Sequence, residues 1–291
     1  MDLTRFIPAA LAILWGLNWP AVKIALSEVP PFALRMTGLG AGALLLLAFA
    51  AARGRSLAIS RPCWVPLAIA GIFNIAAFNL ATVFAQLNTS TSRAAILTFT
   101  TPLWAILLAY LFLGERPDRA RWMALAIGMT GIGILALPLA TGGISPLGIL
   151  FPMIAAISWA AGSVYQKSHP IDGDRMVMTG YQLLLASAVA GVGYIGWGET
   201  MPASLSVQAW VAIVFHVIGA TALAYVLWFT LLSRVSVAAA SLTTLAIPVV
   251  GVIGAMTIVG ERPASLDYVG FAAVLAAAGV SMLSSSRAPQ R

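Results

Sequence analysis

A tryptophan followed eight residues later by a lysine (23 − 15) occurs twice in this chain, each time inside an apolar stretch. The pairs are Trp15 with Lys23 and Trp159 with Lys167, offset by 144 residues (159 − 15 and 167 − 23). A tryptophan ring offers a π-face to an apolar or cationic ligand, so the two rings are predicted to line opposite ends of one binding cavity, with helix packing as the alternative. The two lysines, the only ones present, are predicted to lie toward opposite membrane faces, where they either meet a carboxylate at a gate or extend to water.

Three asparagines also lie in apolar stretches, where an unpaired amide is costly. Asn18 follows Trp15 by less than one helical turn, and Asn74 and Asn79 flank Phe78. The asparagines are predicted either to converge on one polar binding site, with Phe78 beside them, or to join neighbouring helices by hydrogen bonds. Further predicted lining residues of the cavity are Phe99, Ser163, Gln166 and Tyr225.

Two prolines, Pro102 and Pro248, lie 146 residues apart (248 − 102) inside later apolar stretches. A proline lacks an N–H, so the carbonyl group four residues earlier loses its helical partner. Those carbonyl groups belong to Thr98 and Thr244. The four residues are predicted to act in binding or gating, because a free carbonyl can accept a hydrogen bond from an ammonium group, and a static kink is the alternative.

Groups for proton relay, metal binding or redox chemistry are missing from these stretches. All nine carboxylates are expected at termini or in loops, so no buried acidic relay is predicted. Cys63 is the single cysteine, which excludes a cysteine-based metal site. His216 is interpreted as a hydrogen-bonded packing residue in preference to a proton carrier, and no cofactor is predicted.

The composition places these residues in a membrane. Of the 291 residues, 60% are hydrophobic and 9% are charged, and the mean hydropathy is +0.96. The net charge of +7 comes from scattered basic residues, not from a basic face with interleaved aromatic residues, so nucleic acid is not an expected partner. The expected partners are the lipid bilayer and a small-molecule substrate, and the pattern is compatible with a monomer.

The apolar runs, each about 20 residues long, predict an all-α integral membrane protein. Ten transmembrane helices are predicted, at Phe6–Leu26, Phe32–Ala52, Trp64–Phe84, Ala94–Leu113, Arg121–Ala140, Leu147–Tyr165, Met176–Trp197, Ala209–Leu231, Ala238–Val259 and Leu266–Leu283. With both termini in the cytoplasm, the cytoplasmic segments hold 12 of the 16 Lys and Arg residues, as the positive-inside rule requires. The outer segments keep Lys23, Arg35, Arg93 and Arg262, of which those at helix ends are expected to extend to water.

Sequence repetition divides the chain into two halves, residues 1–145 and 146–291. At an offset of 146 residues, the tetrapeptide Gly114-Glu115-Arg116-Pro117 recurs as Gly260-Glu261-Arg262-Pro263. Five spans in each half force the second half to enter the membrane from the opposite side. The prediction is therefore two inverted five-helix repeats, the plan of many secondary transporters.

These motifs, the opening Trp-Gly-x-Asn-Trp-Pro-Ala-Val-Lys and the doubled Gly-Glu-Arg-Pro, resemble those of EamA-type drug/metabolite transporters, and among them the YddG-like amino-acid exporters. The resemblance covers essentially the whole chain. It implies a ten-helix carrier of the bacterial inner membrane that exports small metabolites through a central cavity. Related small multidrug exporters use a glutamate in the first helix, which this chain lacks.

The leading functional hypothesis is an alternating-access exporter of apolar or aromatic amino acids. A carrier of sugar phosphates or drugs is the alternative, although a phosphate would require Lys or Arg deep in the bundle, where the pattern places none. Ser163 and His216 could imitate a catalytic dyad, but no oxyanion motif accompanies them, so an intramembrane enzyme is a remote alternative, as is a non-transporting scaffold.

Overall fold

The computed structural model describes residues 6–140, 143, 145–232 and 246–286, and every regular element within these ranges is a helix. A helical stretch overlaps each predicted span, and seven of the described stretches are long and apolar enough to cross a membrane. The prediction of an all-α, multi-pass membrane protein is thus confirmed. The helices, with 3-10 and π segments marked η, are α1 (Ile7–Ala25), α2 (Pro31–Ala52), η2 (Arg61–Cys63), α3 (Trp64–Gly71), η3 (Ile72–Ala77), α4 (Phe78–Asn88), α5 (Thr91–Thr98), α6 (Thr101–Leu113), α7 (Arg119–Ala136), η4 (Leu137–Leu139), α8 (Leu147–Ser168), α9 (Arg175–Trp197), α10 (Val207–Val214), η5 (Phe215–Leu223), α11 (Ala224–Leu232), α13 (Ala246–Gly254), η6 (Ala255–Val259) and α14 (Ser265–Ser286).

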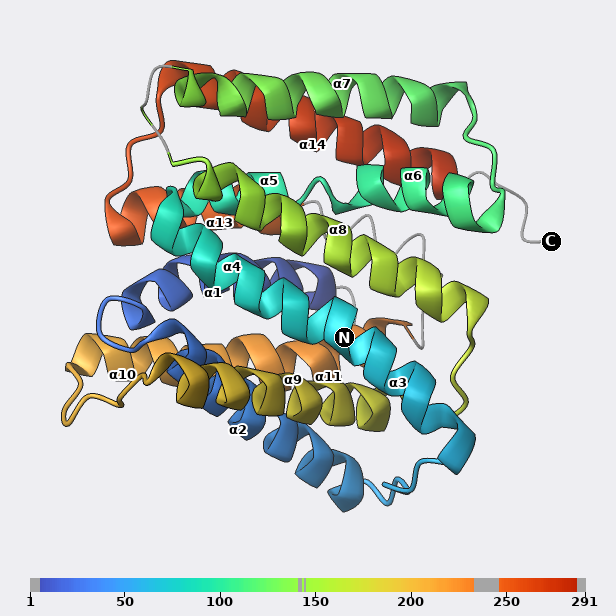
Figure 1. Ribbon diagram of the computed structural model, residues 1–291, viewed down its shortest axis with the longest axis vertical. Helices are drawn as coiled ribbons and strands as arrows, with labels where there is room; N and C mark the ends of the chain where they lie inside the picture. The colour runs from blue at the N-terminus through green and yellow to red at the C-terminus, as the bar shows by residue number, and fades with distance from the viewer. Residues whose placement is uncertain (1–5, 141–142, 144, 233–245, 287–291) are drawn as a thin grey trace.

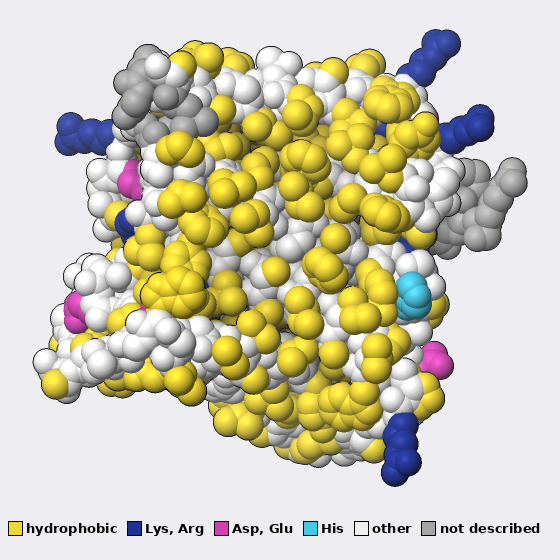
Figure 2. Space-filling model, in the orientation of Figure 1, with side chains coloured by type: hydrophobic (Ala, Val, Ile, Leu, Met, Phe, Trp, Pro, Cys, Tyr) yellow, Lys and Arg dark blue, Asp and Glu magenta, His cyan; other side chains and the backbone are white. Residues whose placement is uncertain are grey.

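The helices run between two ends of the bundle, at the left and right edges of Figure 1. We call the left edge the capped end; its connections are residues 26–30, 89–90, 198–206 and 260–264. We call the right edge the basic end; its connections are residues 53–60, 114–118 and 169–174. In Figure 2, apolar side chains cover the visible face between these ends, while charged side chains protrude at the two edges. This distribution is that of a lipid-facing belt between two polar surfaces.

Close packing between the two halves of the chain depends on small residues. Helix α2 packs along α9, α7 along α14, and α1 along α13. A Cβ atom added to Gly16 of α1 would lie 2.6 Å from Val250 Cβ of α13, and one added to Gly270 of α14 would lie 2.6 Å from Leu135 Cγ of α7. Glycine lets helix backbones approach each other where a methyl group would collide, which is the usual device for packing helices in lipid.

Several helices are interrupted within the bundle. Segments η3, η5 and η6 are π-helical, and the hydroxyl of Thr221 donates to the carbonyl oxygen of His216, five residues earlier, at 2.9 Å. Between α5 and α6 the helix breaks at Phe99 and Thr100, just before Pro102. Such irregular segments are frequent at functional sites, and in transporters they accompany substrate binding.

Candidate transport site

One group of aromatic residues surrounds Trp15. Its ring packs edge-on against Tyr225, with ring centroids 6.0 Å apart, and tilted against Trp228 at 5.7 Å. The indole Nε1–H donates to the carbonyl oxygen of Ala220 in η5 at 3.0 Å. Trp15 therefore links α1 to the π-helix and to α11. We call Trp15, Tyr225 and Trp228 the Trp15 cluster.

A second group surrounds Trp159 on α8. Its ring packs edge-on against Phe78 at 4.8 Å. Asn74 Nδ2 donates to the Trp159 carbonyl oxygen at 3.2 Å and to Ser163 Oγ at 3.4 Å, and Asn74 Oδ1 accepts from Gln166 Nε2 at 3.0 Å. These five residues, the Trp159 cluster, join α8 to η3 and α4. Both groups thus pair a tryptophan of one half of the chain with an aromatic ring of the other half.

A third group is polar and buried. Arg35 is 3% exposed and His216 is 2% exposed. Arg35 Nε donates to the Asn79 carbonyl oxygen at 3.0 Å, Nη2 donates to Thr82 Oγ1 at 3.1 Å, and Nη1 lies 3.3 Å from His216 Nε2. A guanidinium group only donates, so His216 Nε2 accepts, and the Nδ1–H donates to Asn18 Oδ1 at 2.8 Å. We call these five residues the Arg35 network; its imidazole is neutral and acts in packing.

The three asparagines therefore do not converge on one site. Asn18 and Asn79 belong to the Arg35 network, whereas Asn74 belongs to the Trp159 cluster, where its amide is fully used between helices. A Cβ added to Gly162 would lie 1.9 Å from Asn74 Oδ1, so α8 fits closely against this side chain. Ser163 and His216 belong to different groups, and the imagined dyad is not formed.

The expectation that basic residues at helix ends extend to water is wrong for Arg35 and Arg93, which lie near the starts of α2 and α5. Arg35 and Arg93 are 3% and 7% exposed, and each turns inward toward a partner instead of outward to water. Lys23 behaves similarly, because its Nζ donates to the Gln86 carbonyl oxygen on α4 at 2.5 Å. A long basic side chain stays inside when a carbonyl group or carboxylate satisfies it there. Lys167, near the basic end, forms an exposed ion pair with Glu115.

The predicted proline kinks are only partly described. Phe99, half-buried, lies in the break between α5 and α6, and Pro102 lies in the first turn of α6. The Thr98 carbonyl oxygen is not free, since Thr101 Oγ1 donates to it at 2.8 Å. Pro248 is buried in α13, and Thr244 lies outside the described residues.

Carboxylates at the capped end bind helix N-termini across the two halves of the chain. Glu199 accepts from the amides of Phe32 and Ala33 at the start of α2, at 3.3 and 2.9 Å. Glu28 accepts from the amide and hydroxyl of Ser206 at the start of α10; these hydrogen bonds lower the pKa of Glu28 below its usual value of 4.5. Exposed N–H groups and the helix dipole favour a carboxylate at such positions.

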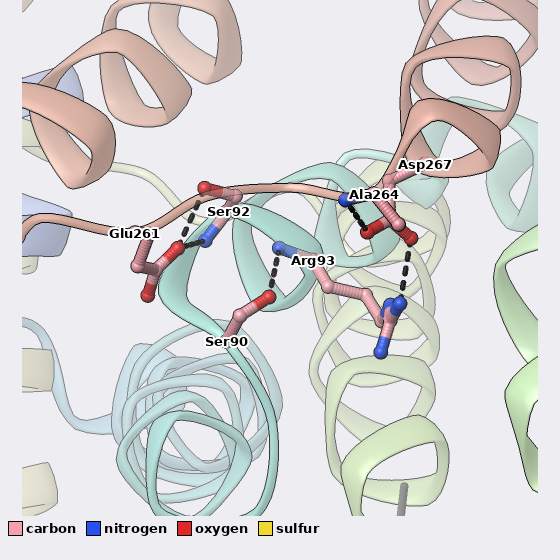
Figure 3. Close-up of polar contacts among 6 residues, drawn as sticks. All are labelled: Ser90, Ser92, Arg93, Glu261, Ala264 and Asp267. Carbon is pink, nitrogen blue, oxygen red and sulfur yellow. Dashed lines mark hydrogen bonds and ion pairs between the residues drawn. The ribbon is translucent and has the colours of Figure 1, made fainter. Parts of the chain in front are cut away.

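The start of α5 carries the most extensive of these contacts (Figure 3). Glu261 accepts from the amides of Thr91 and Ser92, at 2.5 and 2.9 Å, and from the Ser92 hydroxyl at 2.7 Å. At the next residue, Arg93 Nη2 and Asp267 Oδ1 form an ion pair at 2.6 Å with side chains 9% and 11% exposed. The expectation that no carboxylate is buried is therefore wrong for Asp267, because Arg93 and the amide of Ala264 compensate its charge.

Buried polar atoms without a hydrogen-bond partner gather in the same region. In the part of the chain that the structure describes, five such atoms lie between residues 86 and 98: Gln86 Oε1, Thr89 Oγ1, Thr91 Oγ1, Arg93 Nε and Thr98 Oγ1. Each unpaired buried group costs about 1–3 kcal/mol. The corner formed by α4 and α5 is therefore the least satisfied buried region.

Sequence reasoning missed these carboxylates as cross-links between helices. One signal was available: α2 begins at Pro30 and Pro31, and neither offers a capping side chain. A helix start without its own cap, near acidic loops at the same end, indicates a cap supplied from elsewhere in the chain. The sequence does not say which of the acidic loops supplies it.

Comparison with known proteins agrees with this architecture. The EamA-like transporter family model matches residues 6–137 and again 146–284. The chain is 29% identical over 275 residues to the uncharacterized inner membrane transporter YedA of Escherichia coli, covering 91% of this chain and 86% of that protein. It is 26% identical over 274 residues to a probable amino-acid metabolite efflux pump of E. coli, covering 89% and 88%.

A solved crystal structure shares the fold, with a TM-score of 0.67 at 22% identity over 99% of both chains. The relatives named above are transporters, and the family is one of transporters and not of enzymes. The alternative of an intramembrane enzyme is therefore excluded. The family model matches both halves and nearly all of the described helices, and the chain belongs to the EamA-like transporter family.

Proposed function

We propose that this protein is a secondary transporter that exports apolar or aromatic amino acids by alternating access. The observation that carries this proposal is the pair of aromatic contacts, Trp15 with Tyr225 and Trp159 with Phe78. Each contact joins a tryptophan of one half of the chain to an aromatic ring of the other half, and the two tryptophans are repeat-related, 144 residues apart (159 − 15). Aromatic rings that meet across two moving halves can hold an apolar side chain between them.

The proposal includes two inverted five-helix repeats, residues 1–145 and 146–291. The two separate family matches support it, as does the pairing of corresponding helices α2 with α9 and α7 with α14. The π-helical segments η3 and η5 also correspond, at an offset of 143 residues between their first residues (215 − 72). In such transporters the substrate lies near the membrane midplane between the repeats.

Within this arrangement, interrupted helices supply polar groups for a zwitterion. A carbonyl oxygen can accept two hydrogen bonds, so the Thr98 carbonyl group, which already accepts from Thr101 Oγ1, can also accept from an ammonium group. The exposed hydroxyl of Ser163 can donate to a carboxylate in place of the Trp159 carbonyl oxygen. The similarity to an amino-acid metabolite efflux pump supports this substrate class. The similarity to an inner membrane transporter supports the same location, with the basic end in the cytoplasm.

A phosphorylated substrate is the competing hypothesis, because Arg35 is buried within the bundle. Its Nε, Nη1 and Nη2 atoms already bind or contact Asn79, Thr82 and His216. An incoming phosphate would have to displace these partners. The amino-acid hypothesis requires only that the Ser163 hydroxyl give up its own hydrogen bond to the Trp159 carbonyl oxygen.

The test is transport by purified protein in liposomes, with a panel of large and small amino acids and one sugar phosphate. Truncation of Trp15 or Trp159 to alanine removes a ring contact of about 1 kcal/mol, so apparent affinity for large apolar amino acids should fall roughly several-fold. Alanine should be little affected as a substrate. Trp64→Ala is the matched control, because Trp64 packs on Tyr181 near the basic end, outside both clusters.

Two outcomes would contradict the proposal. Transport of the sugar phosphate alone would move the substrate site to Arg35. A uniform loss for every substrate in Trp15→Ala and Trp159→Ala, in step with a lower melting temperature, would make both rings packing residues.

A further inference from the structure

Helix α5 is buried along its whole length although it lies at the end of the bundle. All residues of Thr91–Thr98 are buried. Its first turn is held by Glu261 and its third residue, Arg93, by Asp267, and both acidic residues belong to the segment between η6 and the first turn of α14. Figure 3 shows the two contacts side by side at the same turn of α5. One short segment of the second half thus fixes one short helix of the first half.

Helix α5 is also separated from α6. The helical pattern weakens at Phe99 and Thr100: the Phe99 amide is shared between the carbonyl oxygens of Ala95 and Ile96, and the Thr100 amide donates to that of Leu97, three residues earlier. Helix α6 starts again with Pro102 in its first turn. Because Pro102 has no N–H and the Thr100 amide lacks the regular bond to the residue four earlier, backbone rotation here breaks fewer helical hydrogen bonds than rotation within a regular helix. Rotation about this point would move α5 as a unit away from α8 and α13, on which it packs, while α6 stays packed on α8.

The polar atoms of this corner would gain partners if it opened. Gln86, Thr89, Thr91 and Thr98 each bury a side-chain oxygen that has no hydrogen-bond partner in the closed arrangement. Water would satisfy these atoms once the corner separated from the second half. This gain offsets part of the loss of the Glu261 and Asp267 contacts, so the closed and open arrangements come closer in free energy.

We propose that α5 is a hinged gate at the capped end, held closed by Glu261 and Asp267 and turning about Phe99 and Thr100. The inference rests on the alternating access proposed above and adds the moving element and its latch. The hydrogen bonds of Glu261 act in the closed state only, so weakening them shifts the population toward the open state.

The experiment measures access to a buried position of α5 without substrate. Cys63 is replaced by serine, and Ala95, which is 0% exposed, is replaced by cysteine. A charged methanethiosulfonate reagent is added to the protein in liposomes, and the labelling rate is followed. Glu261→Gln removes the charge and places an amide N–H₂ group opposite the N–H donors of α5, which weakens the contact. Because hydrogen bonds to a charged group are strong, the labelling rate of Ala95→Cys should rise roughly tenfold.

Three further variants separate gating from general loosening. Glu115→Gln alters the corresponding residue of the other Gly-Glu-Arg-Pro turn, at the basic end, and should leave the rate within about twofold. Ala186→Cys places the thiol at another position that is 0% exposed, on α9, and its labelling should not change with Glu261→Gln. Ser92→Ala removes a single hydrogen bond to Glu261 and should give a smaller increase at Ala95→Cys, even if Glu261→Gln does not fold.

An unchanged labelling rate in folded Glu261→Gln and Ser92→Ala proteins would overturn the gate. An equal rise at Ala95→Cys and Ala186→Cys would also overturn it, since general unfolding would then explain both. Because substrate is absent, this result is independent of the transport panel. Failure of the amino-acid hypothesis would leave the gate standing, and failure of the gate would leave the substrate class open.

Discussion

The two ends of the bundle use acidic residues in different ways. At the basic end, Asp118 and Asp174 cap their own helices, accepting from amides two or three residues later in the chain. At the capped end, Glu28, Glu199 and Glu261 accept from helices of the other half of the chain, more than 160 residues away. Caps of the first kind remain when the halves separate, whereas caps of the second kind must break.

The doubled Gly-Glu-Arg-Pro turn shows the same difference within one motif. Gly114 and Gly260 have φ angles of +68° and +77°, and the next residue, Glu115 or Glu261, donates its amide to the carbonyl oxygen six residues earlier. The two turns are therefore the same helix ending. Yet Glu115, whose side chain is 37% exposed, forms an ion pair with Lys167, whose side chain is 64% exposed. Glu261 instead accepts a hydrogen bond from the amide of Thr91 at the buried start of α5.

Burial decides how much each ion pair contributes. Arg93 and Asp267 at the capped end are 9% and 11% exposed, whereas Arg55 and Asp174 at the basic end are 43% and 29% exposed. Exposed pairs contribute little because water and salt screen them. The structure is thus one in which the halves are firmly joined at the capped end and loosely joined at the basic end.

The largest expected effect concerns which compartment each end faces. If the basic end is cytoplasmic, a membrane-impermeant maleimide should leave Cys63 unlabelled in intact cells and label it in inverted vesicles. In a Cys63→Ser background, Ser27→Cys, which lies exposed at the capped end, should show the opposite pattern. Labelling of Cys63 in intact cells would reverse the proposed orientation and place the gate on the cytoplasmic side.

The next effect tests the contrast between the ion pairs. Arg93→Ala leaves the Asp267 carboxylate buried without its counter-charge, which should lower the free energy of unfolding in detergent by about 3–5 kcal/mol. Arg55→Ala, which removes the same side chain from the exposed pair, should cost no more than about 1 kcal/mol.

A double variant checks the reason for this difference. In Arg93→Met with Asp267→Asn, no charge is left unpaired, so most of the lost stability should return. Equal costs for Arg93→Ala and Arg55→Ala would remove the distinction between the two ends.

The location of the helices could be predicted from the sequence because the signals are local. Apolar runs and breakers such as Pro30-Pro31 and Gly260 mark where helices begin and end, and among the described residues a helical stretch overlaps each predicted span. Trp15 and Trp159 were singled out because they repeat, and Phe78 and Tyr225 were named with them, whereas Trp228 of the Trp15 cluster was not predicted. Neighbouring residues and repeats carry this information without any knowledge of packing.

The partners of polar side chains could not be predicted in the same way. Arg35 was expected to extend to water, and Lys23 either to do the same or to meet a carboxylate at a gate. The sequence alone does not reveal that His216, Thr82 or the Gln86 carbonyl group lies within reach. Asn74 was grouped with Asn18 by residue type, whereas helix packing separates them. These contacts depend on the rotation of each helix about its own axis, which packing against neighbours decides.

The smallest effect expected concerns Glu28, the exposed member of the capped end. Hydrogen bonds from Ser206 lower its pKa below 4.5, so the carboxylate binds Ser206 more strongly when it is ionised. Its contribution to stability is therefore complete above pH 4.5 and is lost as the pH falls through the lowered pKa. Hydrogen–deuterium exchange at the start of α10 should be slower in the wild-type protein than in Glu28→Gln at neutral pH, and this difference should vanish at acidic pH. The Ser206 hydroxyl, which is uncharged, also accepts from the amide of Ala209 at 3.1 Å. A difference that persists unchanged under acid would mean that the charge of Glu28 does not hold the start of α10. That helix would then be capped locally by Ser206, like the helices that Asp118 and Asp174 cap at the basic end.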